Sequence, residues 1–84
     1  KWALIPEGVD VLITHGPPAK YGDLCADGRR VGCEALLQHL DRVRPRVHLF
    51  GHIHEDRGEW QLGKTRIVNC TTGEGEFPPT VIDL

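Results

Sequence analysis

The order of apolar and polar residues divides the chain into short segments separated by glycine and proline. Residues 9–14, Val-Asp-Val-Leu-Ile-Thr, are short, β-branched and almost continuously apolar, which predicts a strand buried on both faces. The strand should end at or just before His15, because Gly16 permits a sharp turn and the two prolines after it cannot donate to a sheet. His15 is therefore expected at the C-terminal end of a buried strand.

A helix and a second strand follow this first strand. Between residues 31 and 43 apolar residues recur at helical spacing, which predicts an amphipathic helix that covers one face of a sheet. Pro45 should end the helix, since the residue before a proline is disfavoured in helical conformation. Residues 47–50, Val-His-Leu-Phe, predict a second strand that stops at Gly51. Strand, helix and strand in this order predict a right-handed βαβ unit with parallel strands.

The rest of the chain predicts short antiparallel strands. Residues 59–62 and 65–69 are strand-like and flank Gly63 and Lys64, which form a turn signal typical of a hairpin. Residues 74–79 predict a loop, and residues 80–84 predict a last strand. No repeat or linker interrupts the 84 residues, so we expect one α/β unit.

Composition excludes several classes of partner. Ten basic and twelve acidic residues give a net charge of −2 without a basic stripe, so binding to nucleic-acid polymers is not indicated. No apolar run approaches the roughly 20 residues that span a bilayer, so no membrane segment is expected. Cys25, Cys33 and Cys70 lack the spacing of a zinc ribbon or a disulfide framework. We expect three thiols in a reducing compartment, and hence a cytoplasmic location.

The candidate chemistry lies in histidines at the ends of the two parallel strands. His15 ends the first strand, and Gly51-His52-Ile53-His54 follows the second. Ligands bind at the carboxyl edge of open α/β sheets, and a glycine beside each strand end should let the backbone turn out of the sheet. Three imidazoles converging there suit Zn, Mn, Fe or Ni. A His-x-His pair is common, however, so spacing alone leaves a purely structural role open.

The flanking residues make the pattern specific. Thr14-His15-Gly16-Pro17-Pro18 and Gly51-His52-Ile53-His54 resemble the last two signature motifs of the calcineurin-like metallophosphoesterase superfamily. Residues 9–18, 31–33, 45–55 and 68–69 closely resemble its branch of metallophosphoesterase-domain-containing proteins, and the resemblance extends over residues 2–84. It implies that residues 1–84 are the C-terminal half of a four-layer α/β/β/α metallophosphoesterase sandwich.

The resemblance also implies a function and a set of ligands. His15 and His52 would bind one of two divalent metal ions (Mn, Fe or Zn), and His54 would bind the other. The implied activity is hydrolysis of a phosphoester by a hydroxide that bridges the metals, with phosphodiesters such as cyclic nucleotides as candidate substrates. The family's earlier motifs, which supply a bridging aspartate and a catalytic histidine, are absent from the chain. The missing N-terminal half would therefore be a required partner, and this chain alone is predicted to be inactive.

Several other residues are weaker candidates. Asn69 is a candidate for a hydrogen bond to a ligating histidine, as outer-sphere partners often are, or for an ordinary turn residue. Thr71 belongs to a small polar loop that is a candidate for lining a substrate pocket or is an ordinary loop, and Gly51 is a further candidate for the pocket. Asp23 and Arg29 could reach a phosphate or simply belong to an exposed loop.

The two remaining histidines, His48 and His39, are expected to have structural roles. His48 lies within a strand and is expected in the core with a backbone partner, and His39 is expected to be solvated on the helix. A function from another class also stays open, namely a non-catalytic metal-binding or interaction fragment of such a protein.

Overall fold

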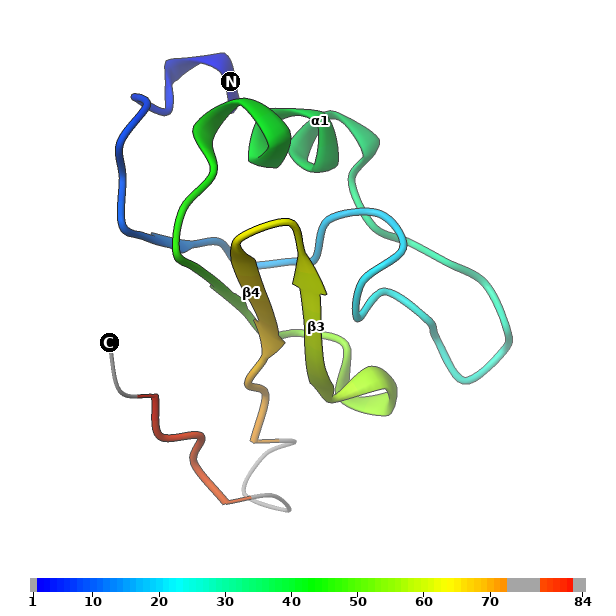
Figure 1. Ribbon diagram of the computed structural model, residues 1–84. Coiled ribbons are helices and arrows are strands. Elements are labelled where there is room, and N and C mark those ends of the chain that lie inside the picture. The colour runs from blue at the N-terminus through cyan, green and yellow to red at the C-terminus, as the bar shows by residue number, and fades with distance from the viewer. Residues whose placement is uncertain (1, 73–77, 83–84) are drawn as a thin grey trace.

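The structure is a computed structural model, and it describes residues 2–72 and 78–82. Its elements, in chain order, are η1 (Trp2–Leu4), β1 (Val11–Ile13), α1 (Glu34–Val43), β2 (Val47–Phe50), η2 (His54–Asp56), β3 (Gly58–Leu62) and β4 (Thr65–Asn69). The strands form one mixed sheet in the order β1-β2-β4-β3. α1 lies on one side of this sheet, and the N-terminal segment lies beside the helix (Figure 1). The predicted α/β class is confirmed.

The predicted βαβ unit consists of β1, α1 and β2. β1 pairs with β2 in parallel, with Val11 opposite Val47 and Ile13 opposite Leu49. β4 then pairs in parallel with the other side of β2. Consequently β1, β2 and β4 all point their carboxyl ends at the same edge of the sheet, where ligands of α/β proteins bind.

The helix α1 begins three residues later than the sequence predicts. Residues before it are extended, because Cys33 exchanges backbone hydrogen bonds with the segment after His15: Ala19 N–H donates to its carbonyl at 3.1 Å and its own N–H donates to Pro17 O at 3.1 Å. Cys33 is the N-cap, and its sulfur accepts from Leu36 N–H at 3.4 Å.

The helices within residues 2–72 and 78–82 are all too short or too polar to span a membrane.

The strand β1 differs from the prediction of a strand buried on both faces. It has three residues, it lies at an edge of the sheet, and Ile13 is 72% exposed. Only β2 pairs with it among the described residues, so one side of its ladder and much of one face stay open. The apolar run in the sequence predicts burial, but it cannot tell where in the sheet the strand lies. The second sheet of the four-layer sandwich stays a prediction.

The core lies between α1 and one face of the sheet. Leu40 from the helix packs with Phe50 of β2 and Ile67 of β4, and partly buried residues surround this cluster: Leu12, Tyr21, Trp60 and Leu62. Fully burying a side chain of this size stabilises a fold by about 1.5–3 kcal/mol. This packing fixes the helix over β2 and β4, and it thereby fixes the parallel strands whose carboxyl ends carry the histidines.

The predicted hairpin is confirmed, whereas the predicted last strand is not. β3 and β4 pair in antiparallel fashion around Gly63, which has φ of +58° and so suits a tight turn. Residues 80–82 belong to no strand, and residues 83–84 lie outside the described residues, as does most of the predicted loop at 74–79. Arg57 holds this segment instead, donating to Pro78 O at 2.9 Å and to Thr80 Oγ1 at 3.3 Å. Two prolines before Thr80 cannot donate to a ladder, which disfavours a strand here.

Candidate metal centre

The structure brings His15 and His52 together at the carboxyl edge of the sheet. Each lies two residues beyond the end of its strand, β1 or β2, and the backbone pairing continues as Gly51 N–H donates to His15 O at 3.2 Å. The centroids of the two imidazole rings are 4.8 Å apart, with the planes tilted by 42°. Both side chains are exposed. The two rings meet because β1 and β2 are parallel neighbours and each strand is followed by a histidine at the same distance from its end.

The backbone at His52 adopts a conformation that the sequence did not indicate. His52 has φ of +77°, and Ile53 N–H donates to Gly51 O at 3.0 Å, which is the pattern of a γ-turn with a left-handed central residue. The turn was expected at glycine, but neither Gly16 nor Gly51 has a positive φ. Such a conformation in a residue with a side chain costs about 1–3 kcal/mol and clusters at functional sites.

His54 does not join the ring pair. It is exposed and begins η2, so the extended geometry that would place residues 52 and 54 on one side is absent. Among residues 2–72 and 78–82, no three His, Cys, Asp or Glu side chains are grouped so as to hold a metal ion. His54 thus stays a predicted ligand, and the described residues bring together two of the three candidate histidines.

Asn69 holds the segment that carries His54. Its buried side chain donates to Ile53 O at 2.7 Å and to Asp56 O at 2.9 Å, and its Oδ1 accepts from Thr71 N–H at 3.3 Å. Both N–H groups of the Asn69 side chain bond to backbone carbonyls, and Asn69 thereby fastens this loop to the end of β4, which is more than the role of an ordinary turn residue. Its role as a partner of a ligating imidazole stays a prediction.

The buried residue His48 has a side-chain partner rather than the expected backbone partner. Its Nε2 lies 3.0 Å from Thr14 Oγ1, and Thr14 Oγ1 in turn donates to Gly16 O at 2.7 Å. His48 is fully buried, and burial lowers its pKa from 6.5 to about 4, so the ring is neutral at physiological pH. Thr14 is a residue of the site that sequence reasoning missed, although its place between the strand and His15 was a usable signal.

Asp23 organises the loop between β1 and α1. Burial opposes ionisation of Asp23, but hydrogen bonds from Lys20 N–H, Arg30 and Gly32 N–H outweigh it and hold its pKa below the ordinary value. Arg29 pairs with Asp27 at the surface instead, at 2.7 Å. Both residues proposed as phosphate contacts therefore have partners within their own loop.

That loop is also tied to the helical turn beside the histidines. Leu24 N–H donates to Asp56 Oδ2 at 3.1 Å, and Ala26 N–H donates to Glu55 Oε2 at 3.1 Å. η2 is thus held on two sides, by this loop and by Asn69.

Two hollows flank the histidine pair. One, of about 390 Å³, has a largely apolar lining of Ile13, Thr14, His15, Leu49, Phe50, Gly51, His52 and Cys70. The other, of about 380 Å³, is lined by Trp2, His15, Gly16, Pro17, Val31, Cys33, His52 and Ile53. His15 and His52 belong to both linings, so the ring pair has space for a ligand on either side. Thr71 lines neither hollow, but its backbone lies next to Gly51.

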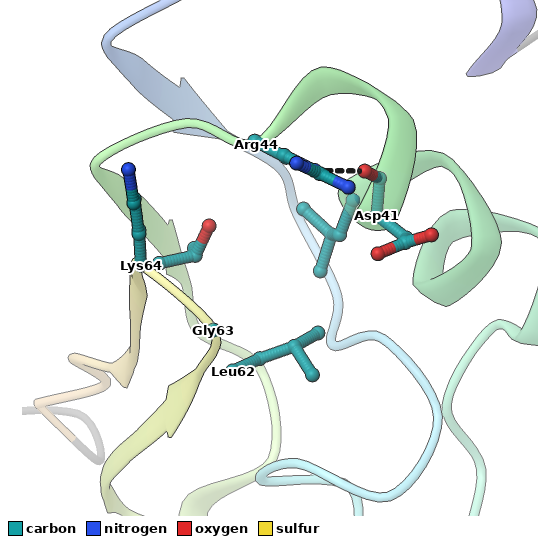
Figure 2. Close-up of a pocket in the computed structure, with 7 residues that line it drawn as sticks. Asp41, Arg44, Leu62, Gly63 and Lys64 are labelled. Atoms are coloured by element: carbon teal, nitrogen blue, oxygen red, sulfur yellow. Dashed lines mark hydrogen bonds between the residues drawn. The ribbon is translucent and has the colours of Figure 1, made fainter.

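A third hollow lies at the other end of the parallel strands (Figure 2). It measures about 370 Å³ between the end of α1 and the β3–β4 turn, where Asp41 and Arg44 of the helix end face Leu62 and Lys64 of the hairpin. Arg44 Nε donates to Asp41 O at 2.9 Å. This hollow contains no histidine and is separate from the candidate metal centre.

The motifs predicted a βαβ unit with three converging histidines at its strand ends, and the described residues bring two of them, His15 and His52, together. Sequence comparison agrees with the family that the motifs indicated. The chain belongs to the branch of metallophosphoesterase domain-containing proteins. No protein-family profile matches the chain.

Individual relatives support this placement. The chain is 52% identical over 90 aligned residues to metallophosphoesterase domain-containing protein 1 of Homo sapiens and of Mus musculus, and the match covers all of the chain. It is 54% identical over 71 residues to a UPF0046 protein of Caenorhabditis elegans, covering 83% of the chain. The chain spans only 28% of the length of the mammalian relatives and 18% of the nematode protein.

Proposed function

We propose that this chain carries part of the metal centre of a metal-dependent phosphoester hydrolase, and that this hydrolase is a phosphodiesterase. His15 and His52 bind one divalent metal ion, and His54 binds the second. The observation that supports the proposal most directly is the pair of exposed imidazoles 4.8 Å apart at the ends of neighbouring parallel strands. The names of the mammalian relatives support the phosphoesterase class.

The residues present fit part of a metal site. Two neutral imidazoles supply two nitrogen ligands, which Zn, Mn and Fe all accept, and they leave the charge of the ion uncancelled. A tetrahedral zinc site needs four ligands, and the described residues group no third candidate with the pair. The remaining ligands, including a carboxylate between the two metals, would come from the part of the protein beyond this chain. That N-terminal part is the required partner, and the chain alone is inactive.

The surroundings of the pair suit a phosphoester substrate. When bound, two divalent ions would supply Lewis acidity toward the phosphoryl oxygens. The strained turn at His52 and the bonds from Asn69 hold the ligand-bearing backbone in place before substrate binds. The largely apolar hollow of about 390 Å³ beside the rings offers room for the organic part of a diester such as a cyclic nucleotide. Gly51, which lines that hollow, and Thr71 next to it are the pocket residues of this proposal.

A cytoplasmic location is part of the proposal. It is supported by the spacing of Cys25, Cys33 and Cys70, which is not that of a disulfide framework and suits a reducing compartment.

The alternative is a non-catalytic metal-binding or interaction fragment. The observation that favours it is the incomplete ligand set, together with the edge strand β1 and its exposed Ile13, which invite association with another chain. Metal bound by the intact protein without phosphoester hydrolysis would favour this alternative.

The test compares four alanine variants of the intact protein. His15→Ala, His52→Ala and His54→Ala each remove one proposed ligand, and His39→Ala removes a histidine on α1 whose contact is Arg42 Nε at 3.1 Å. Metal content by mass spectrometry and hydrolysis of a chromogenic phosphodiester are measured for each. In each ligand variant the rate of hydrolysis should fall by more than the roughly 10- to 100-fold that loss of an outer contact of a metal ligand costs. His39→Ala should behave as wild type. Full metal content and turnover in all three ligand variants would refute the assignment.

A further inference from the structure

Just beyond the carboxyl end of β1, half-buried Thr14 and fully buried His48 form a polar pair whose hydrogen atoms can be assigned. The Thr14 hydroxyl has a single proton and donates it to Gly16 O at 2.7 Å. His48 Nε2, 3.0 Å from the same oxygen, must then be the donor, so Nε2 carries the proton of the neutral ring. His48 Nδ1 is consequently a bare acceptor, and it has no partner among the described residues. The bond to Thr14 is the hydrogen bond through which the structure anchors this ring.

The hydrogen bond from Thr14 to Gly16 spans His15 in the chain. Thr14 precedes His15 and Gly16 follows it, so the hydroxyl bond closes a short turn with His15 at its centre. The backbone of the same turn is bonded to the β2 segment on either side, through Thr14 N–H to Leu49 O at 3.0 Å and Gly51 N–H to His15 O at 3.2 Å. His48 projects from β2 and is fully buried, which gives the turn a rigid support.

We propose that Thr14 and His48 are positioning residues that hold His15 in the direction required for metal binding. This inference rests on the proposed function of His15. An exposed histidine on a free loop would have to be ordered when the metal binds, and the hydrogen-bond chain from His48 through Thr14 to Gly16 orders its backbone in advance. Outer contacts of metal ligands typically contribute about 10- to 100-fold in affinity, and they usually act on the ring. Here the contact acts through the backbone beside the ring.

A merely structural role predicts a different result, and the chain offers a matched control. Thr65 is likewise a threonine whose hydroxyl donates to a backbone carbonyl, Pro45 O, at 2.6 Å, although Thr65 is buried and Thr14 is half-buried. It starts β4, at the end of the parallel strands opposite to the histidines. Thr65→Val therefore removes the same kind of bond as Thr14→Val, and only Thr14→Val should affect the metal centre.

The experiment measures the dissociation constant of Zn²⁺ by competition with a chromogenic chelator, in the intact protein. Thr14→Val should weaken binding by about 10-fold, at the lower end of the range for outer contacts. Thr14→Ser, which keeps the hydroxyl, should bind Zn²⁺ like wild type. Thr65→Val should lower the unfolding midpoint about as much as Thr14→Val but leave Zn²⁺ affinity unchanged. Wild-type affinity in Thr14→Val, or equal losses in Thr14→Val and Thr65→Val, would overturn the inference.

A second pair of variants tests the other end of the hydrogen-bond chain and remains decisive if Thr14→Val does not fold. His48→Gln retains an N–H near the position of Nε2, and His48→Leu does not. Zn²⁺ affinity should be retained in the former and reduced in the latter, and the opposite order would count against the proposal. His15→Ala distinguishes a failure of the proposed function from a failure of this inference alone. If His15→Ala binds Zn²⁺ like wild type, the proposed function and this inference both fail. If His15→Ala loses Zn²⁺ while Thr14→Val and His48→Leu keep it, only the inference fails.

Discussion

Lowering the pH should destabilise this protein through one buried histidine, His48. The ring is fully buried, and burial lowers its pKa from 6.5 to about 4. Replacing His48 by glutamine keeps an N–H for Thr14 but removes the titration. The difference in unfolding free energy between wild type and His48→Gln, followed against pH, therefore isolates the contribution of this one group.

The sign and size follow from the two pKa values. In the unfolded chain the ring takes up a proton near pH 6.5, whereas in the folded protein it stays neutral down to about pH 4. Between these values the unfolded state binds more protons, so stability falls as the pH falls from 6.5 to about 4, and it is unaffected by His48 above this window. Each pH unit corresponds to about 1.4 kcal/mol, which gives a total loss of about 3 kcal/mol across the window.

The assay is urea unfolding of the intact protein at several pH values from about 7 to about 4, with His39→Gln as the matched control. His39→Gln makes the same replacement at a histidine on α1, outside the Thr14–His48 pair. Asp23 does not interfere with this measurement. Its pKa in the folded protein lies below the ordinary value of 3.8, so its contribution to stability is fully present above pH 3.8 and is lost only as the pH falls through the pKa of the folded state. Parallel stability curves for wild type and His48→Gln would refute the reasoning.

The remaining predictions concern packing around the candidate site. Asn69→Leu should cost about 3 kcal/mol in urea unfolding and weaken Zn²⁺ binding, because it leaves two loop carbonyls without their donor; a loss below about 1 kcal/mol would contradict this. Gly32→Ala should also cost about 3 kcal/mol, since its Cβ would meet the backbone of Pro18 and Ala19 at 2.3–2.6 Å. Gly16→Ala, whose Cβ meets nothing within 4 Å, should stay within about 0.5 kcal/mol of wild type, and equal losses in both would contradict the steric argument.

Elements governed by neighbours in sequence were predicted well. The helical spacing of apolar residues identified α1, and Gly63 with Lys64 identified the β3–β4 turn, because periodicity and turn geometry are properties of short segments. The start of α1 was placed too early. Residues 31–33 fit a helix by spacing, but pairing of Cys33 with the chain after His15 holds them extended. A contact between distant segments outweighed the local preference.

The candidate site likewise has features that the sequence predicted and features that it did not. The meeting of His15 and His52 followed from the order of elements, because adjacent parallel strands must end at one edge. The left-handed turn at His52, the bonds from Asn69 and the exposure of Ile13 did not follow. Each depends on which residue lies opposite another across the sheet, and that information is not carried by spacing along the chain.

The amino-acid sequence by itself determined the βαβ unit, the hairpin, the position of two histidines at strand ends and the kinship to metallophosphoesterase domain-containing proteins. Only the tertiary structure decided that Thr14, Gly16 and His48 form one hydrogen-bonded chain around His15. The physical reason is the range of the forces involved. Backbone preferences and apolar periodicity act over a few residues, whereas a hydrogen bond between residues 34 positions apart exists only once packing has brought both side chains together and removed water from His48.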